Sequence, residues 1–355
     1  MNSNRNVSVS GPNEKIIQNK HNDYDSKEEK IMPLVTSKEM LLKAQKGGYA
    51  VGAFNAENME MVKAIIQAAE ELKAPVMIQT TPSTVKYGTV ETYAAIVAAE
   101  AAKASVPVCL HLDHGSSFEL AMQAMHAGYT SVMIDGSKLD FEDNIRETRR
   151  VADVAAALDI PCEAELGKVG GKEDDLEAEA DTNTDPQEAK EFVERTGVTS
   201  LAVAIGTAHG FYVGTPVLDK ERLSEIREVV DIPLVLHGAS GLSDEDVSDC
   251  VKRGICKVNF ATELRAAYSR AVKETFAENE NTIDPRNADS SRSVFLPPFG
   301  HRVSAQWLPT YRMYLICPML RRHSPASLSL SRFKNGQVLQ SAERGTQITF
   351  YLDLK

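Results

Sequence analysis

The 355-residue chain lacks an excess of positive charge and lacks any long apolar run. Lys and Arg number 39 against 50 Asp and Glu, which gives a formal net charge of -11 and a pI near 5.3. A nucleic-acid-binding protein needs a basic footprint, which this composition does not supply. No apolar stretch reaches the roughly 18 residues of a membrane helix, and the polar N-terminus has no apolar signal region. We therefore expect no nucleic-acid partner, no membrane span and no secretion.

Cysteine is also sparse, because the chain has five and none of them forms a CxxC pair. An odd, unpaired set of this kind is typical of reduced thiols in the cytoplasm. Hydrophobic residues make up 43% of the chain and charged residues 25%, the balance of an ordinary globular protein. The composition therefore predicts an acidic cytoplasmic enzyme with enough apolar material for a closed core.

The two ends differ from the middle of the chain. Residues 286–355 carry ten Lys and Arg against three Asp and Glu, are rich in Ser and Pro, and show no sustained periodicity. Residues 1–31 are polar, and the periodic sequence starts near residue 32. We predict a disordered extension over 1–31, a folded body over 32–285 and a divergent, poorly ordered basic tail over 286–355.

Within the body, a short apolar run followed by a helical pattern recurs eight times. The strand-like runs begin at residues 49, 75, 106, 131, 161, 200, 233 and 255, and amphipathic helices are predicted between them, for example over 61–73, 118–128 and 244–254. Eight such units over roughly 230 residues predict an α/β fold of the (β/α)8 TIM-barrel type, whose usual size is about 250 residues. A doubly wound open sheet is the weaker alternative, because no GxGxxG follows the first strand.

Polar side chains gather where the predicted strands end, which is where barrel enzymes keep their chemistry. Three histidines from separate strands, with carboxylates beside them, have the ligand set of a catalytic zinc site. Three unrelated hydrogen-bonded histidines are the alternative. We interpret His111, one pleat before Asp113, as a core or supporting histidine. The glycine-containing segment HGASGLS after the seventh strand and NFATE after the eighth favour a phosphate site.

Seven motifs in order carry a resemblance to a known family. They run from about Met32 to the DPRN segment at 284–287 and read GAFNAEN, HLDHGSSFE, SVMIDGS, EAELGKVGGKEDD, AVAIGTAHGFY, PLVLHGASGL and KVNFATEL. With them the chain resembles the class II, metal-dependent ketose-bisphosphate aldolases, that is, the fructose-bisphosphate and tagatose-bisphosphate aldolases. The resemblance implies a carbon-carbon lyase of carbohydrate metabolism. Its reaction would be the reversible, zinc-dependent cleavage of a ketose 1,6-bisphosphate to dihydroxyacetone phosphate and glyceraldehyde 3-phosphate.

The resemblance also implies a role for each site residue. The zinc ligands fall on His114, His209 and His237, and Glu165 falls near a second metal position or orients a ligand. Asp113 would exchange a proton with the ketose 4-hydroxyl, and Glu173, in a loop with glycines, would move the carbon-bound proton. The implied substrate-binding residues are Asn55, Gly210, Gly238, Ser240, Asn259, Ala261, Thr262 and Arg286. A Na+ or K+ ion near the phosphate and a homodimer or homotetramer are implied as well.

Several points stay open at this stage. Because a metal replaces a Schiff-base lysine, we interpret Lys257 near the start of the eighth strand as structural. Ala261 stands where fructose-type members often carry Asp or Asn, which favours tagatose 1,6-bisphosphate. A metal-dependent TIM-barrel hydrolase and an inactive sugar-phosphate-binding relic are the alternative functions. After Arg286 the basic tail stands in place of the family's helices. To explain this replacement, we favour a frame change or an aberrant splice in the coding sequence over an added functional tail.

Overall fold

The computed structural model describes residues 34–173, 176–178, 183–212, 214–278, 280, 281 and 283. These residues belong to the first of two units of the chain, residues 1–309, and the second unit, 310–355, lies outside them. The predictions for the extension 1–31, for the tail 286–355 and for Arg286 fall outside the described residues as well. They stay predictions.

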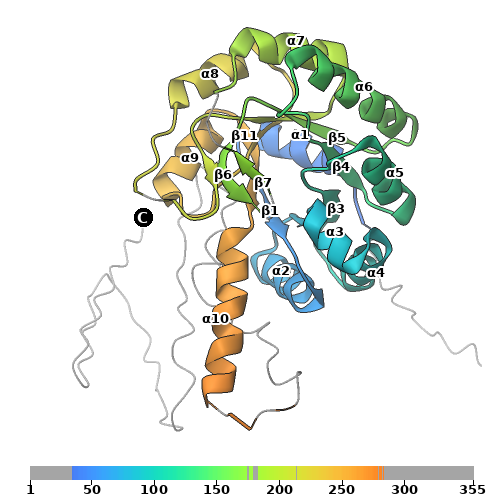
Figure 1. The fold of residues 1–355 in the computed structure, drawn as a ribbon, viewed down its shortest axis with the longest axis vertical. Coiled ribbons are helices and arrows are strands. Elements are labelled where there is room, and N and C mark those ends of the chain that lie inside the picture. Colours follow the sequence, from blue (N-terminus) through green and yellow to red (C-terminus); the bar gives the residue numbers. More distant parts are fainter. Residues whose placement is uncertain are drawn as a thin grey trace, which may run out of the picture. The chain divides into compact units, whose positions relative to one another are not determined.

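Within the described part of the chain, eight parallel strands close into a barrel (Figure 1). Their order around the barrel is β1, β11, β10, β8, β5, β4, β3, β2. Their bounds are Val51–Asn55 (β1), Val76–Thr80 (β2), Val108–Leu112 (β3), Ser131–Ile134 (β4), Cys162–Leu166 (β5), Ser200–Val203 (β8), Leu234–Leu236 (β10) and Ile255–Phe260 (β11). Each strand falls inside one of the eight predicted runs, so the predicted (β/α)8 barrel is confirmed.

Helices surround the strands (Figure 1). Their bounds are Ser37–Gly47 (α1), Met59–Leu72 (α2), Pro82–Gly88 (α3), Val90–Ala101 (α4), Phe118–Ala127 (α5), Phe141–Ala157 (α6), Pro186–Thr196 (α7), Lys220–Val229 (α8), Asp244–Lys252 (α9) and Thr262–Glu278 (α10). Side-chain caps start several of them, as when Ser117 accepts the backbone N-H of Leu120 at the start of α5. Gly128 ends α5 in the left-handed conformation, as its position predicts. None of the described helices is long and apolar enough to cross a bilayer.

The barrel interior changes character along its axis. At the N-terminal end, Met40 and Leu41 of α1 form one apolar cluster with Met77 of β2 and Cys109 of β3. Two residues farther along the same two strands, the buried side chains are Gln79 and His111. The polar part of the interior therefore lies beyond an apolar base, toward the carboxyl ends of the strands, where barrel sites form.

A small sheet of three strands stands apart from the barrel order. It consists of β6 (Gly170–Glu173), β7 (Leu176–Ala178) and β9 (Ala208–His209). β6 pairs antiparallel with β7 and parallel with β9. The sheet therefore joins the segment after β5 to the segment after β8. The sequence did not predict these short strands, because a strand of two or three residues has no measurable periodicity.

Candidate active site

Three histidines from separate segments converge beyond the carboxyl ends of the strands. His114 follows β3, His209 ends β9 and His237 follows β10. One ring nitrogen of each lies within 4.8 Å of those of the other two. The ring centroid of His114 is 4.7 Å from that of His237 and 5.1 Å from that of His209. The structure therefore brings together three imidazoles that can reach one common ion, which is the donor set of a catalytic zinc site.

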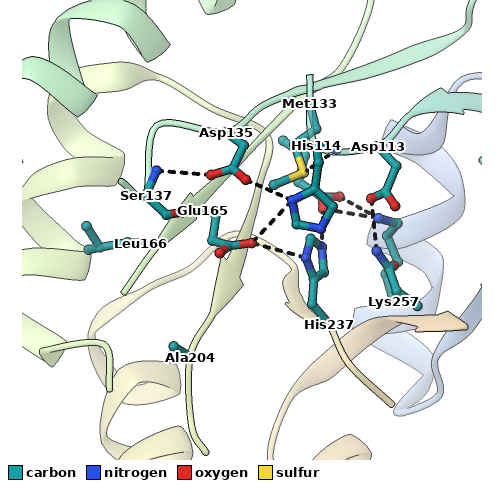
Figure 2. Close-up of polar contacts among 12 residues, drawn as sticks. Asp113, His114, Met133, Asp135, Ser137, Glu165, Leu166, Ala204, His237 and Lys257 are labelled. Carbon is teal, nitrogen blue, oxygen red and sulfur yellow. Dashed lines mark hydrogen bonds and ion pairs between the residues drawn. The ribbon is translucent and has the colours of Figure 1, made fainter. Parts of the chain in front are cut away.

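A carboxylate orients the first of these rings (Figure 2). Nδ1 of His114 lies 2.8 Å from Oδ2 of Asp135, and the Ser137 backbone N-H donates to Oδ1 of Asp135 at 3.0 Å. Burial alone would raise the pKa of Asp135, but the hydrogen bond and charge of His114 hold it well below its ordinary value. Because an ionised carboxylate only accepts hydrogen bonds, Nδ1 of His114 carries a proton. Nε2 is then the nitrogen that faces a metal.

Glu165 lies beside two of the histidines (Figure 2). Its Oε2 is 3.1 Å from Nδ1 of His237 and 4.0 Å from Nδ1 of His114. The ligand atoms of Glu165, His114 and Asp135 form a second group within 4.8 Å of one another. This geometry suits both roles that the sequence leaves open for Glu165, a ligand at a second metal position and a residue that orients a ligand.

His237 is wholly buried and has a carboxylate on each side of its ring. Its Nε2 lies 3.1 Å from Oε1 of Glu163, on the edge opposite Glu165. Burial alone would lower the pKa of His237, but in the metal-free protein the hydrogen bonds to Glu163 and Glu165 raise it to about 9. Burial likewise would raise the pKa of Glu163, but Lys257 and His237 hold it well below its ordinary value. Sequence reasoning missed Glu163, whose only signal was a charge inside a strand-like run.

Amide side chains hold the carboxylate of Asp113. Asn55 donates to its Oδ2 at 3.0 Å and Asn259 donates to its Oδ1 at 3.1 Å. Gln79 donates in turn to Oδ1 of Asn55 at 2.9 Å. Asp113 and Gln79 are both buried. Each oxygen of Asp113 is thus fixed from a different strand, and Gln79 is a supporting residue that the sequence reasoning missed.

A pocket opens next to His209. It is lined by His209, Gly210, Gly238, Ser240, Asn259, Ala261 and Thr262, which include six of the predicted substrate-binding residues. Gly238 has a φ of +65°, and a Cβ there would lie 2.6 Å from the Ala208 carbonyl oxygen, so the close approach of the two loops requires glycine. The Tyr212 hydroxyl joins the same loops, since it donates to the Gly238 carbonyl oxygen at 2.7 Å and accepts from the Ala208 N-H at 2.9 Å.

The segment that carries Glu173 lies against a metal-ligand candidate. In the pairing of β6 with β9, Gly171 is opposite His209, and Glu173 is two residues farther along β6. The structure therefore brings the backbone of the predicted loop to the site. The last predicted substrate residue, Arg286, is outside the described residues. His111 lies deeper in the barrel and bonds through Nδ1 to the Ser131 hydroxyl at 2.8 Å.

Comparison with known proteins gives one family and several solved structures. The sequence model of the family described as class-II fructose-bisphosphate aldolase matches residues 35–294. The YdjI aldolase of Escherichia coli K12 is 37% identical, with a TM-score of 0.67 over 78% of this chain and 97% of that one. A protein assigned as a fructose-1,6-biphosphate aldolase of Coccidioides immitis is 32% identical, with a TM-score of 0.66 over 76% and 92%. The fructose-bisphosphate aldolase of Campylobacter jejuni is 21% identical and shares the fold, with a TM-score of 0.65 over 78% and 95%.

Proposed function

Because this chain belongs to the class II fructose-bisphosphate aldolase family of metal-dependent aldehyde-lyases, we propose that it cleaves a ketose 1,6-bisphosphate. The products would be dihydroxyacetone phosphate and glyceraldehyde 3-phosphate, and the reaction would run in both directions. The observation that carries the proposal is the convergence of three imidazoles within 4.8 Å, beside a carboxylate and a pocket of small residues.

The residues around that point fit a divalent metal, which we propose to be zinc. Nitrogen ligands of neutral histidines are preferred by zinc, and three protein ligands leave one position for substrate. Asp135 and Glu163 each accept from the ring nitrogen of a histidine on the side away from the proposed ion. When bound, such an ion supplies Lewis-acid polarisation of a carbonyl oxygen. The donor set also suits cobalt, so the bound metal has to be measured.

In this proposal the chain's own residues move two protons. Asp113 takes the proton of the 4-hydroxyl as the C3-C4 bond breaks, which releases the aldehyde product. The electron pair of that bond stays on C3, which takes a proton from Glu173 and becomes the hydroxymethyl carbon of dihydroxyacetone phosphate. Asn55 and Asn259 support the first step, because they fix both oxygens of Asp113.

The pocket beside His209 is proposed to bind the phosphate on the dihydroxyacetone side. Ala261 and Thr262 in its lining lie at the start of α10, where the helix dipole favours an anion. The glycines of the lining let backbone approach the ligand closely. Ala261 also favours tagatose over fructose 1,6-bisphosphate in our proposal. We also propose that a Na+ or K+ ion binds near this phosphate and that the chain forms a homodimer or homotetramer.

A coupled assay of triose phosphate formation tests the proposal. The full chain is given each bisphosphate with and without EDTA, and zinc is then added back. We expect cleavage that the chelator abolishes and zinc restores, with tagatose 1,6-bisphosphate cleaved faster. His209→Gln should lose bound metal and cleavage, whereas the control His126→Gln, at an exposed position of α5, should keep both.

Other results would favour the alternatives. Cleavage that resists the chelator, or a lysine adduct trapped by borohydride, would contradict the metal mechanism. Phosphate release without carbon-carbon cleavage would favour a hydrolase. A zinc-loaded chain that binds both sugars without turning them over would favour the inactive relic.

A further inference from the structure

A buried ion pair lies inside the barrel behind His237. The ammonium of Lys257 on β11 is 3.0 Å from each carboxylate oxygen of Glu163 on β5. The exposed fraction of each side chain is 1% or less. Two strands, β10 and β8, separate β11 from β5 in the barrel order, so the pair spans the interior.

Glu163 also bonds to His237, and this contact determines which ring nitrogen faces the proposed ion. Oε1 of Glu163 lies 3.1 Å from Nε2 of His237 and 3.0 Å from the ammonium of Lys257. A carboxylate held by an ammonium accepts hydrogen bonds and donates none, so Nε2 of His237 carries the proton. Nδ1, which lies 3.1 Å from Oε2 of Glu165, is therefore the nitrogen at which a metal would replace a proton.

We propose that Glu163 and Lys257 are positioning residues for the metal site. Glu163 fixes the tautomer and the orientation of His237, and Lys257 fixes Glu163. This inference rests on the proposed role of His237 as a metal ligand. It goes beyond the sequence prediction, in which Lys257 is structural and Glu163 has no role.

The cost of burying charge supports a positioning role over a purely structural one. An ion pair in a barrel interior loses the hydration of both charges, and an apolar pair of similar volume is often as stable or more stable. The base of the same barrel is filled with apolar side chains, among them Met77 and Cys109. A further ionisable neighbour of Glu163 is His111, whose Nε2 is 3.9 Å from Oε2. The need of His237 for a hydrogen-bond acceptor explains why a charged pair lies at this depth, because Glu163 accepts from Nε2 of His237 and Lys257 neutralises Glu163.

Two double variants separate the roles, because both remove the buried charges and only one keeps an acceptor. In Glu163→Gln with Lys257→Met, the amide oxygen still accepts from Nε2 of His237. In Glu163→Met with Lys257→Met, nothing at position 163 does. We expect the two metal-free variants to melt within about 3 °C of each other, because a neutral replacement of a buried pair costs little.

Metal affinity is the deciding measurement, made by competition between the purified full chain and a chromophoric chelator for zinc. We expect the Met/Met variant to bind zinc about 10- to 100-fold more weakly than the wild type, the usual effect of losing a partner of a ligating histidine. The Gln/Met variant should recover most of that loss. Equal zinc affinity in both variants would overturn the inference while leaving the aldolase proposal intact. A wild-type chain that binds no zinc would overturn the proposed function and this inference together.

Discussion

The contact between β6 and β9 makes Gly171 a position where one added methyl group should disturb the site strongly. Gly171 has a φ of +85°, and a Cβ added there would lie 2.2 Å from the carbonyl oxygen of His209 and 2.9 Å from its nitrogen. Both neighbours are backbone atoms, so no side-chain rotation relieves the overlap. In Gly171→Ala the segment that leads to Glu173 and the segment that carries His209 must move apart.

The size of the effect has two parts. An alanine in the left-handed conformation costs about 1 kcal/mol or somewhat more in stability. To bring the Cβ to an ordinary distance from the oxygen, the two backbones must separate by on the order of 1 Å, and a misplacement of that size can lower turnover about 100-fold. We therefore expect a modest loss of stability with a large loss of activity.

Gly197→Ala is the matched control. Gly197 has a φ of +71° at the C-terminus of α7, and a Cβ there meets nothing within 4 Å. Both variants therefore carry the conformational strain, and only Gly171→Ala carries the steric overlap. Denaturant unfolding, zinc affinity and kcat are measured for both. If Gly171→Ala keeps the kcat and zinc affinity of Gly197→Ala, the argument that the β6-β9 contact positions the site is wrong.

Three further predictions concern single side chains. Asp113→Asn should lower kcat about 10²- to 10⁴-fold, the usual contribution of a general base, and metal analysis should find its zinc content unchanged. Tyr212→Phe should raise KM for the phosphorylated sugar about 5-fold, because the loss of a hydrogen bond worth about 1 kcal/mol loosens the two pocket loops, and steady-state kinetics measure it. Burial and Lys257 lower the pKa of His111 from 6.5 to about 3. The unfolded chain thus binds more protons than the folded protein below pH 6.5. The free energy of unfolding of the metal-free protein should therefore fall by up to about 1.4 kcal/mol per pH unit between pH 6.5 and 5. Denaturant unfolding measures this fall, which should be absent in His111→Gln.

Each of these predictions has a contrary result. Loss of zinc in Asp113→Asn would mean that the carboxylate supports the metal instead of moving a proton. A fall in kcat at constant KM in Tyr212→Phe would place the phenol in the chemical step. The same acid sensitivity in His111→Gln as in the wild type would assign that sensitivity to other groups.

The sequence was sufficient for the barrel because each strand is a separate local signal. A run such as SLAVAIG is buried on both faces in a parallel barrel, so its apolar character shows without any knowledge of its neighbours. The closure of the strands into a barrel is predicted by the number of strand-helix units, which is eight. Polar residues at the ends of these runs, such as Asp113 and His237, stood out for the same reason.

Pairing across the interior left no such local signal. Glu163 and Lys257 are charged residues inside apolar runs, and their positions in the sequence do not say that they meet across the barrel. His209 does not directly follow a barrel strand, because β8 ends at Val203 and His209 belongs to the separate strand β9. Its position is fixed by pairing with β6, a contact between segments 38 residues apart.

The turn after β3 shows how one short segment supplies both a proton-transfer group and a metal ligand. Consecutive residues of a strand point to opposite faces, so Asp113 and His114 could not both enter one site if β3 continued through them. β3 ends at Leu112, and His114 adopts a φ of +47°, an uncommon conformation for a residue with a side chain. Gly115 follows, where a Cβ would lie 2.1 Å from the Met133 carbonyl oxygen. The backbone thus turns sharply enough for Asp113 to bond to Asn55 and Asn259 while His114 bonds to Asp135. Strain at His114 is the conformational cost of placing the two groups side by side, and such strain is typical of functional sites.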